Sequence, residues 1–122
     1  MRNKDGGADP WSAVYWIDKI GKSCNVYADD FTWETDSIWE SRTTGNLYPT
    51  SVTIRASHPL TEKEMIYRLK PLIEGQEFVG NRPENAYWEG ACEVFGSDNR
   101  VIGRAYLELA GYGGGLADRL TK

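Results

Sequence analysis

The chain has 122 residues, of which 40% are hydrophobic and 26% are charged, and its formal net charge at pH 7 is −4. These values are typical of one globular domain. No apolar run approaches the roughly 20 residues of a membrane helix, and no basic cluster indicates a nucleic-acid surface. We therefore expect neither a membrane nor nucleic acid as a partner. The first seven residues lack the apolar core of a signal peptide, which predicts a cytoplasmic protein.

Cysteine and histidine are scarce. The chain holds Cys24, Cys92 and a single histidine, His58. Two cysteines do not make a disulfide framework in a chain of this size, so we expect both to be reduced. A single histidine excludes most metal sites, and it excludes a catalytic Cys-His or Ser-His pair at any place other than His58. Its position in a turn before Pro59 predicts an exposed ring. We expect no metal and no cofactor.

The first half of the chain reads as hairpins. Residues 1–11 form a polar lead-in, and alternating runs at 12–17 and 22–27 predict a first hairpin. The segment 29–41 fits a helix or strands, and its aromatic and Thr content favours short strands. Residues 42–49 have turn composition. We expect Trp11, Trp16 and Trp33 to be mostly buried. Trp39 and Tyr48 are predicted to be barrel-closing core residues and not ligand contacts.

A second hairpin is predicted from residues 50–56 and 64–70, which both alternate apolar and polar side chains. If Ile54 lies opposite Tyr67, every apolar member of both runs falls on one face, which supports this register. Residues 71–85 are irregular, with Gly and Pro interruptions.

The clearest element is a third hairpin, from residues 87–94 and 100–109. With Val94 opposite Val101, one face is wholly apolar and the other is polar. The register also pairs Cys92 with Gly103, Gly90 with Ala105 and Trp88 with Leu107. The polar face groups Tyr87, Glu89, Arg104, Tyr106 and Glu108.

Each face of the third hairpin has two interpretations. The small residues Gly90, Cys92, Gly103 and Ala105 either accommodate a close approach of another chain segment, which we favour, or leave space for an apolar ligand. On the polar face, ion pairing in solvent is favoured over the alternative of cavity carboxylates that donate a proton. Many short strands without a long helical period predict an all-β antiparallel barrel or sandwich.

Several motifs resemble one known family. The segments 87–91 (YWEGA) and 103–112 (GRAYLELAGY) are similar to the closing signature of the lipocalin-like carotenoid hydratases. That family is also called the hydroxyneurosporene synthase or predicted secreted hydrolase family. The segment 39–49, of pattern WxSxxTGxxYP, and the pairs Gln76-Glu77 and Asp30-Phe31 resemble its upstream motifs in the same order.

The resemblance implies an antiparallel lipocalin-like (calycin-type) barrel domain over residues 12–112, followed by a flexible tail at 113–122. Family members resemble two such barrels in tandem, and this chain is similar to their C-terminal part. Some members hydrate a prenyl or carotenoid double bond by protonating the alkene. The positions implied to contact a ligand or close the barrel are Trp39, Tyr48, Glu77, Trp88, Glu89, Tyr106 and Glu108, with no residue assigned as catalytic.

The same comparison implies that the opening strands of the barrel are missing. Open sheet edges must be covered or paired, so we expect a homodimer that completes the barrel by self-association. The sequence favours a non-catalytic module that binds an apolar or aromatic small molecule. One alternative is an acid-catalysed hydratase, isomerase or cyclase of prenyl or polyene substrates that uses Glu89 or Glu108. The other is a structural or interaction subunit that supplies strands to a partner.

Overall fold

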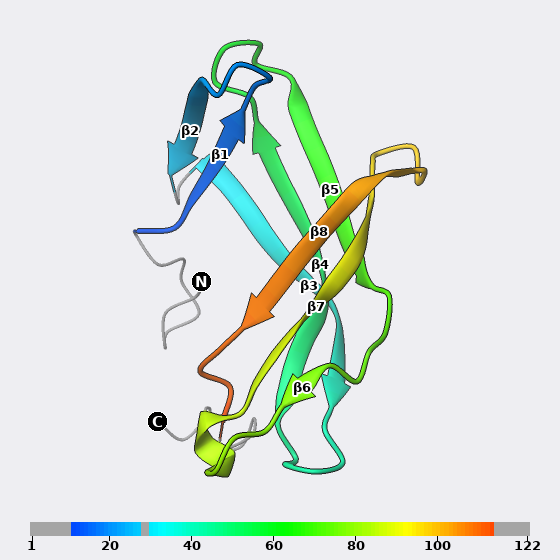
Figure 1. Cartoon of the computed structure of the whole chain (residues 1–122). Helices are drawn as coiled ribbons and strands as arrows, with labels where there is room; N and C mark the ends of the chain where they lie inside the picture. The colour runs from blue at the N-terminus through cyan, green and yellow to red at the C-terminus, as the bar shows by residue number, and fades with distance from the viewer. Residues whose placement is uncertain (1–10, 28–29, 114–122) are drawn as a thin grey trace.

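The computed structural model describes residues 11–27 and 30–113, which form an all-β antiparallel fold of two sheets (Figure 1). The smaller sheet is a hairpin of β1 (Ala13–Ile17) and β2 (Ser23–Tyr27). The larger sheet contains β3 (Phe31–Glu40), β4 (Leu47–Ser57), β5 (Glu64–Pro71), β6 (Glu77–Phe78), β7 (Tyr87–Phe95) and β8 (Val101–Leu109). A short 3-10 turn, η2 (Pro83–Asn85), lies directly before β7. Among the described residues, no helix is long and apolar enough to span a membrane.

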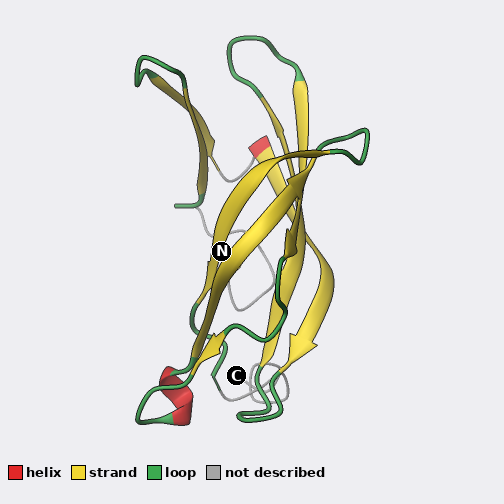
Figure 2. Cartoon of the chain, turned by 45° about the vertical axis from the view of Figure 1, so that its right-hand side comes forward, coloured by secondary structure: helices red, strands yellow, loops and turns green. Residues whose placement is uncertain are grey.

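The larger sheet is a curved barrel that stays open. Its strands follow the order β3-β4-β5-β7; β6 pairs with the first residues of β7, and β8 pairs with β7 along its length. The β7–β8 hairpin crosses in front of β3 and β4 (Figures 1 and 2). Within the described part of the chain, nothing pairs β3 with β8, so both are edge strands. The predicted open, antiparallel, lipocalin-like architecture is confirmed.

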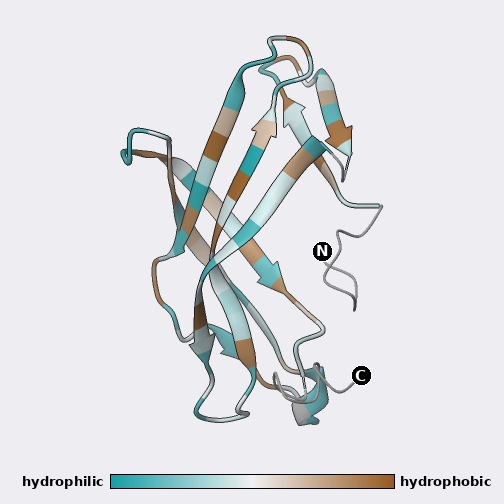
Figure 3. Ribbon diagram, turned by 180° about the vertical axis from the view of Figure 1, so that it is seen from behind, coloured by the Kyte–Doolittle hydropathy of each residue, from teal (hydrophilic) through white to brown (hydrophobic). Residues whose placement is uncertain are grey.

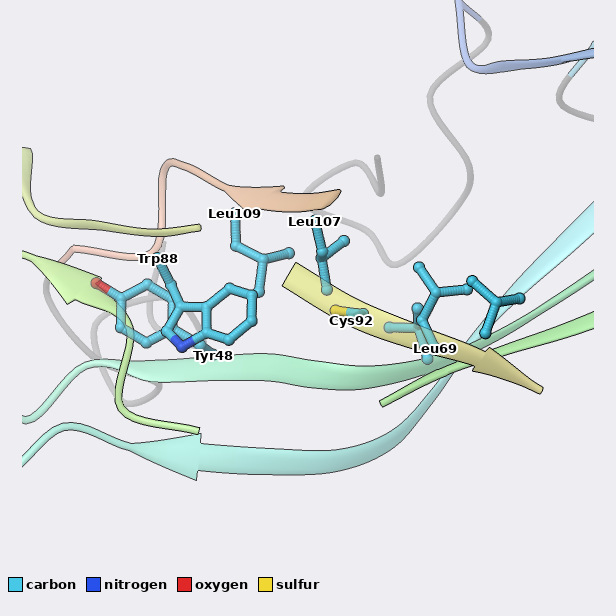
Figure 4. Close-up of a cluster of buried hydrophobic side chains, with 8 residues drawn as sticks. Tyr48, Leu69, Trp88, Cys92, Leu107 and Leu109 are labelled. Atoms are coloured by element: carbon cyan, nitrogen blue, oxygen red, sulfur yellow. The ribbon is translucent and has the colours of Figure 1, made fainter. Parts of the chain in front are cut away.

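The core lies between the two ends of this curved sheet (Figure 4). Tyr48 of β4 and Trp88 of β7 are fully buried in it. The Trp88 indole N–H donates to the Glu74 carbonyl oxygen at 2.6 Å, so its polar atom is satisfied. Hydrophobic and hydrophilic residues alternate along the strands (Figure 3), and one face of β4, β5, β7 and β8 supplies the buried residues of this core. The buried cluster consists of Tyr48, Val52, Leu69, Trp88, Cys92, Val94, Leu107 and Leu109.

The first two hairpins agree with the sequence prediction. Strands β1 and β2 pair as expected, and Ile54 lies opposite Tyr67 in the β4–β5 pair. The ambiguous segment 29–41 contains one long strand, β3, interrupted by register irregularities between Thr35 and Trp39. The turn predicted over 42–49 is shorter, because β4 already begins at Leu47.

The predicted register of the third hairpin is wrong by two residues. Trp88 lies opposite Leu109, and Val94 lies opposite Gly103 instead of Val101. The turn between β7 and β8 closes with Gly96 N–H donating to the Arg100 carbonyl oxygen at 2.9 Å, and a bulge next to Val94 absorbs the offset. Because the shift is even, each side chain of the paired stretch stays on its predicted face. Val101, however, is 53% exposed.

Four residues are buried to a different degree than the sequence predicts. Trp11 is 89% exposed, and Trp16 and Trp33 are only half-buried. His58 is half-buried, because the β1–β2 hairpin folds over the turn after β4 and places Trp16 against its ring, with 5.1 Å between ring centroids. Both cysteines are free thiols, Cys24 half-buried and Cys92 buried in the core. Residues 1–10 and 114–122, where the lead-in and most of the tail were predicted, lie outside the described residues.

The small residues of the third hairpin divide between the two interpretations. Gly90 is covered by the Gln76 side chain, whose amide nitrogen donates to the Ile73 carbonyl oxygen. A Cβ at Gly90 would overlap the Gln76 amide group, whereas a Cβ at Gly103 would meet no atom within 4 Å. Close packing therefore explains Gly90, and open space remains beside Gly103.

We expect Gly90→Ala to lower the free energy of unfolding by about 0.5–1.5 kcal/mol, because the flexible end of Gln76 must move and lose its hydrogen bond to the Ile73 carbonyl oxygen. Gly103→Ala is the matched control and should change stability little. Urea denaturation of both variants measures the difference. In a Gln76→Ala background the loss from Gly90→Ala should shrink; an undiminished loss would contradict the proposed overlap.

Candidate functional site

A row of apolar side chains crosses the inner face of the sheet at the end of the barrel that lies away from the β3–β4 turn. We call this the open end. Trp33 of β3 lies opposite Ile54 of β4, and Ile54 lies opposite Tyr67 of β5. All three are half-buried and pack against the core, as does Ala105 of β8. We call Trp33, Ile54, Tyr67 and Ala105 the inner wall. Gly103, with open space around it, continues this face along β8.

A polar cluster lies where β6 meets the turn between β3 and β4. The Glu77 carboxylate accepts hydrogen bonds from the hydroxyls of Ser41 (2.5 Å), Thr44 (2.6 Å) and Tyr48 (2.7 Å). The Asn46 amide donates to the same carboxylate at 3.4 Å. These five residues form the Glu77 cluster. It joins β6 to the β3–β4 turn, 29 to 36 residues earlier in the chain.

The local sequence shapes the β3–β4 turn so that its side chains can bind the Glu77 carboxylate. The Ser41 hydroxyl oxygen accepts the backbone N–H groups of Thr43 and Thr44, and so holds the first half of the turn. Gly45 has a φ of 75°, a backbone conformation that glycine adopts without steric cost. The Ser, Thr, Gly and Tyr positions of the 39–49 motif therefore have a structural explanation, because they shape one loop around a carboxylate.

The hydrogen bonds of the Glu77 cluster keep the Glu77 carboxylate ionised, which makes it a structural hydrogen-bond acceptor and a poor proton donor. Burial raises the pKa of Glu77, but the hydrogen bonds from Ser41, Thr44, Tyr48 and Asn46 outweigh burial and hold that pKa below its ordinary value. Burial and the hydrogen bond to Glu77 raise the pKa of Tyr48 to about 12. At neutral pH the carboxylate is therefore charged and the phenol keeps its proton.

The structure brings three residues of the resemblance together beside the Glu77 cluster. Trp39 stacks on Tyr48, with ring centroids 6.1 Å apart and 23° between the planes. Tyr48 also contacts the ring of Tyr112 at 5.9 Å, and it shares the core with Trp88. These aromatic residues fill the closed end of the barrel with their own side chains.

The other three residues of the resemblance lie on the opposite face of the sheet. Glu89 lies directly opposite Glu108, and Tyr106 lies opposite Ala91 and is 65% exposed. None of them shares a face with the buried Trp88, Cys92 or Leu107. A cavity acid at Glu89 or Glu108 stays a prediction, and this placement does not favour it.

The inner wall was not singled out as a site from the sequence, although the signal was present. The predicted pairing of Ile54 with Tyr67 already placed both side chains on one face. The missing information was how much of that face the chain itself would cover. Within 11–27 and 30–113, no group of three or more His, Cys, Asp or Glu side chains is placed to hold a metal ion.

Replacing Glu77 with Gln should lower the free energy of unfolding at neutral pH by about 1–3 kcal/mol, because buried donors lose a charged acceptor. Since the folded-state pKa of Glu77 lies below its ordinary value, the carboxylate contributes stability that is present above about pH 4.5 and lost as the pH falls through the folded pKa. The stability difference between wild type and variant, measured by urea denaturation, should therefore narrow as the pH falls below about 4.5. Glu34→Gln, at an exposed position on β3, is the control. A pH-independent difference would contradict this prediction.

Comparison with known proteins assigns the family. A family model described as AttH-like matches residues 1–112, and no curated protein matches the chain. A crystal structure of a putative AttH from Nitrosomonas europaea is 27% identical, with a TM-score of 0.72. The match covers 91% of this chain and 32% of that one, so the chain spans about a third of the relative's length. The chain belongs to the AttH-like family, which has a lipocalin-like fold and is related to the carotenoid hydratases.

Proposed function

We propose that this AttH-like domain is a binding module for an apolar or aromatic small molecule, which it holds on the inner wall. The observation that carries the proposal is the row formed by Trp33, Ile54 and Tyr67, which lie opposite one another on three adjacent strands and remain only half-buried. Apolar surface left in contact with water is unfavourable by about 25 cal/mol per Å², and a ligand that covers the row recovers that free energy.

The shape of the inner wall favours a flat or extended ligand. Trp33 and Tyr67 stand on either side of Ile54, so two aromatic rings flank an aliphatic side chain. The open space beside Gly103 adds room along β8. Pockets for small molecules are typically apolar with a few polar groups, and the Tyr67 hydroxyl is the polar group of this row. A prenyl chain or a polyene with one polar end has the matching chemistry.

Titration with farnesol and retinol, a prenyl and a polyene alcohol, should quench tryptophan fluorescence, because Trp33 belongs to the wall. Ile54→Ala should weaken the measured binding roughly three- to tenfold through lost apolar contact. Ile102→Ala is the matched control, since Ile102 is 55% exposed and lies next to Gly103 on the opposite face of β8. The proposal would be contradicted if neither alcohol quenched the fluorescence. It would also be contradicted if Ile54→Ala and Ile102→Ala lost affinity equally.

We further propose that the chain corresponds to the C-terminal part of longer two-barrel relatives and completes its own barrel by pairing with a second copy. Its coverage of 32% of the putative AttH chain supports a match to one part of a longer relative, and the C-terminal placement rests on the likeness of residues 87–91 and 103–112 to the closing signature of the carotenoid hydratases. The second rests on the free edges of β3 and β8. An unpaired edge strand presents a row of backbone donors and acceptors, which a twofold-related copy can satisfy.

Light scattering should give a mass about twice the 13.8 kDa of the chain at roughly tens of micromolar protein, and dilution should lower it toward the monomer by mass action. A mass of 13.8 kDa throughout this range would contradict self-association. It would favour a subunit that lends its edges to a different chain.

A further inference from the structure

The β1–β2 hairpin and the turn between β4 and β5 enclose a groove that the proposed function does not use. Its volume is about 320 Å³. Cys24 of β2 and His58, the only histidine of the chain, meet in it, with 3.5 Å between Sγ and Nε2. Trp16, at 5.1 Å from the His58 ring, and Leu60 supply apolar lining. A nucleophilic atom and an imidazole therefore share a cavity large enough for a small molecule.

The hydrogen bonds of His58 assign its tautomer. The backbone N–H of Leu60 donates to Nδ1 at 3.2 Å, so Nδ1 carries no proton in the neutral ring. The proton of the neutral imidazole is then on Nε2, the nitrogen that faces Cys24. In this tautomer Nε2–H donates to the Cys24 sulfur, which accepts. His58 thus acts as a hydrogen-bond donor to the sulfur atom and is not positioned as a base.

The thiolate is the nucleophilic form of cysteine, and the Nε2–H donor faces the sulfur atom that would carry this charge. The charged groups that line the groove are Asp18 and Lys22. The Asp18 carboxylate already accepts the backbone N–H groups of Ile20 (3.0 Å) and Lys22 (2.9 Å), which fixes it to the β1–β2 turn.

The second cysteine provides an internal contrast. Cys92 is fully buried in the barrel core, and its thiol lies 3.7 Å from the Gly90 carbonyl oxygen, to which it donates. Burial raises the pKa of Cys92, which disfavours its thiolate. Cys24 has the groove, the histidine donor and partial exposure, and Cys92 has none of them.

We propose that Cys24 is a thiol–disulfide exchange site for small disulfides that enter the groove beside His58. The Cys24 thiolate attacks one sulfur of the disulfide, a new bond forms between that sulfur and Sγ, and the old disulfide bond breaks with release of one small thiolate. The mixed disulfide persists until an external thiol reduces it, because Cys92 is enclosed in the core and cannot attack it.

The test uses 5,5′-dithiobis(2-nitrobenzoate) as the small disulfide and the full chain at neutral pH. One equivalent should react rapidly, and peptide mapping should place it on Cys24. Cys92→Ser should leave the rapid reaction intact, and Cys24→Ser should abolish it. If Cys24 reacts no faster than the same cysteine in a peptide of residues 19–28, the proposal is overturned.

Substitution of the histidine separates its role from simple exposure of the thiol. His58→Phe should slow the Cys24 reaction by roughly tenfold, because the ring remains but the donor is lost. His58→Gln, which keeps an N–H donor, should restore part of the rate. Leu60→Ala, which alters the groove wall but keeps the backbone N–H, is the control and should stay within about twofold. An unchanged rate in His58→Phe with a native circular dichroism spectrum would overturn the assignment.

Discussion

Tyr48 connects the hydrophobic core of the larger sheet to the Glu77 cluster. Its ring is buried between β4 and the β7–β8 hairpin, and its hydroxyl donates to Glu77 on β6. A buried tyrosine needs a partner for its hydroxyl, and a partly buried carboxylate needs hydrogen-bond donors. Each group therefore offsets the desolvation cost of the other. The same contact fixes the β3–β4 turn, because Ser41 and Thr44 bind the same carboxylate. The junction therefore ties β6 and the β3–β4 turn to the core that lies between β4 and the β7–β8 hairpin.

This junction also explains why the proposed binding is assigned to one end of the barrel and not to the other. Near Glu77 the interior is filled by Trp39, Tyr48 and Trp88, and the described part of the chain has no buried side-chain N or O atom without a hydrogen-bond partner. Farther along the same strands, Trp33 and Ile54 are only half-covered. A ligand at the closed end would have to displace well-packed aromatic rings, whereas at the open end it covers surface that is already exposed to water.

Local alternation was enough to predict which side chains share a face, but not every register. The pairing of Ile54 with Tyr67 was predictable because both strands have a clear apolar face. The predicted register of the third hairpin was offset by two residues, because its turn and bulge carry no apolar pattern. Since the shift is even, the side chains still lie on their predicted faces. The contact of Cys24 with His58, 34 residues apart, depends on how two hairpins pack, which no local pattern encodes. Likewise, the resemblance located Glu77, but only the structure shows its donors.

The proposed ligand binding and the proposed self-association would be physically linked in an open barrel of this kind. The inner wall begins on β3, an edge strand, and ends on β8, the other edge strand. In the proposed dimer, a copy that pairs with either edge would extend the wall and remove water from its margin, so a ligand would gain more contact than on the single chain. By linkage, a ligand that binds the paired state more tightly also stabilises that state, by the same free energy. Weak binding by the isolated chain and tight binding by the proposed completed barrel would then be two measurements of one equilibrium.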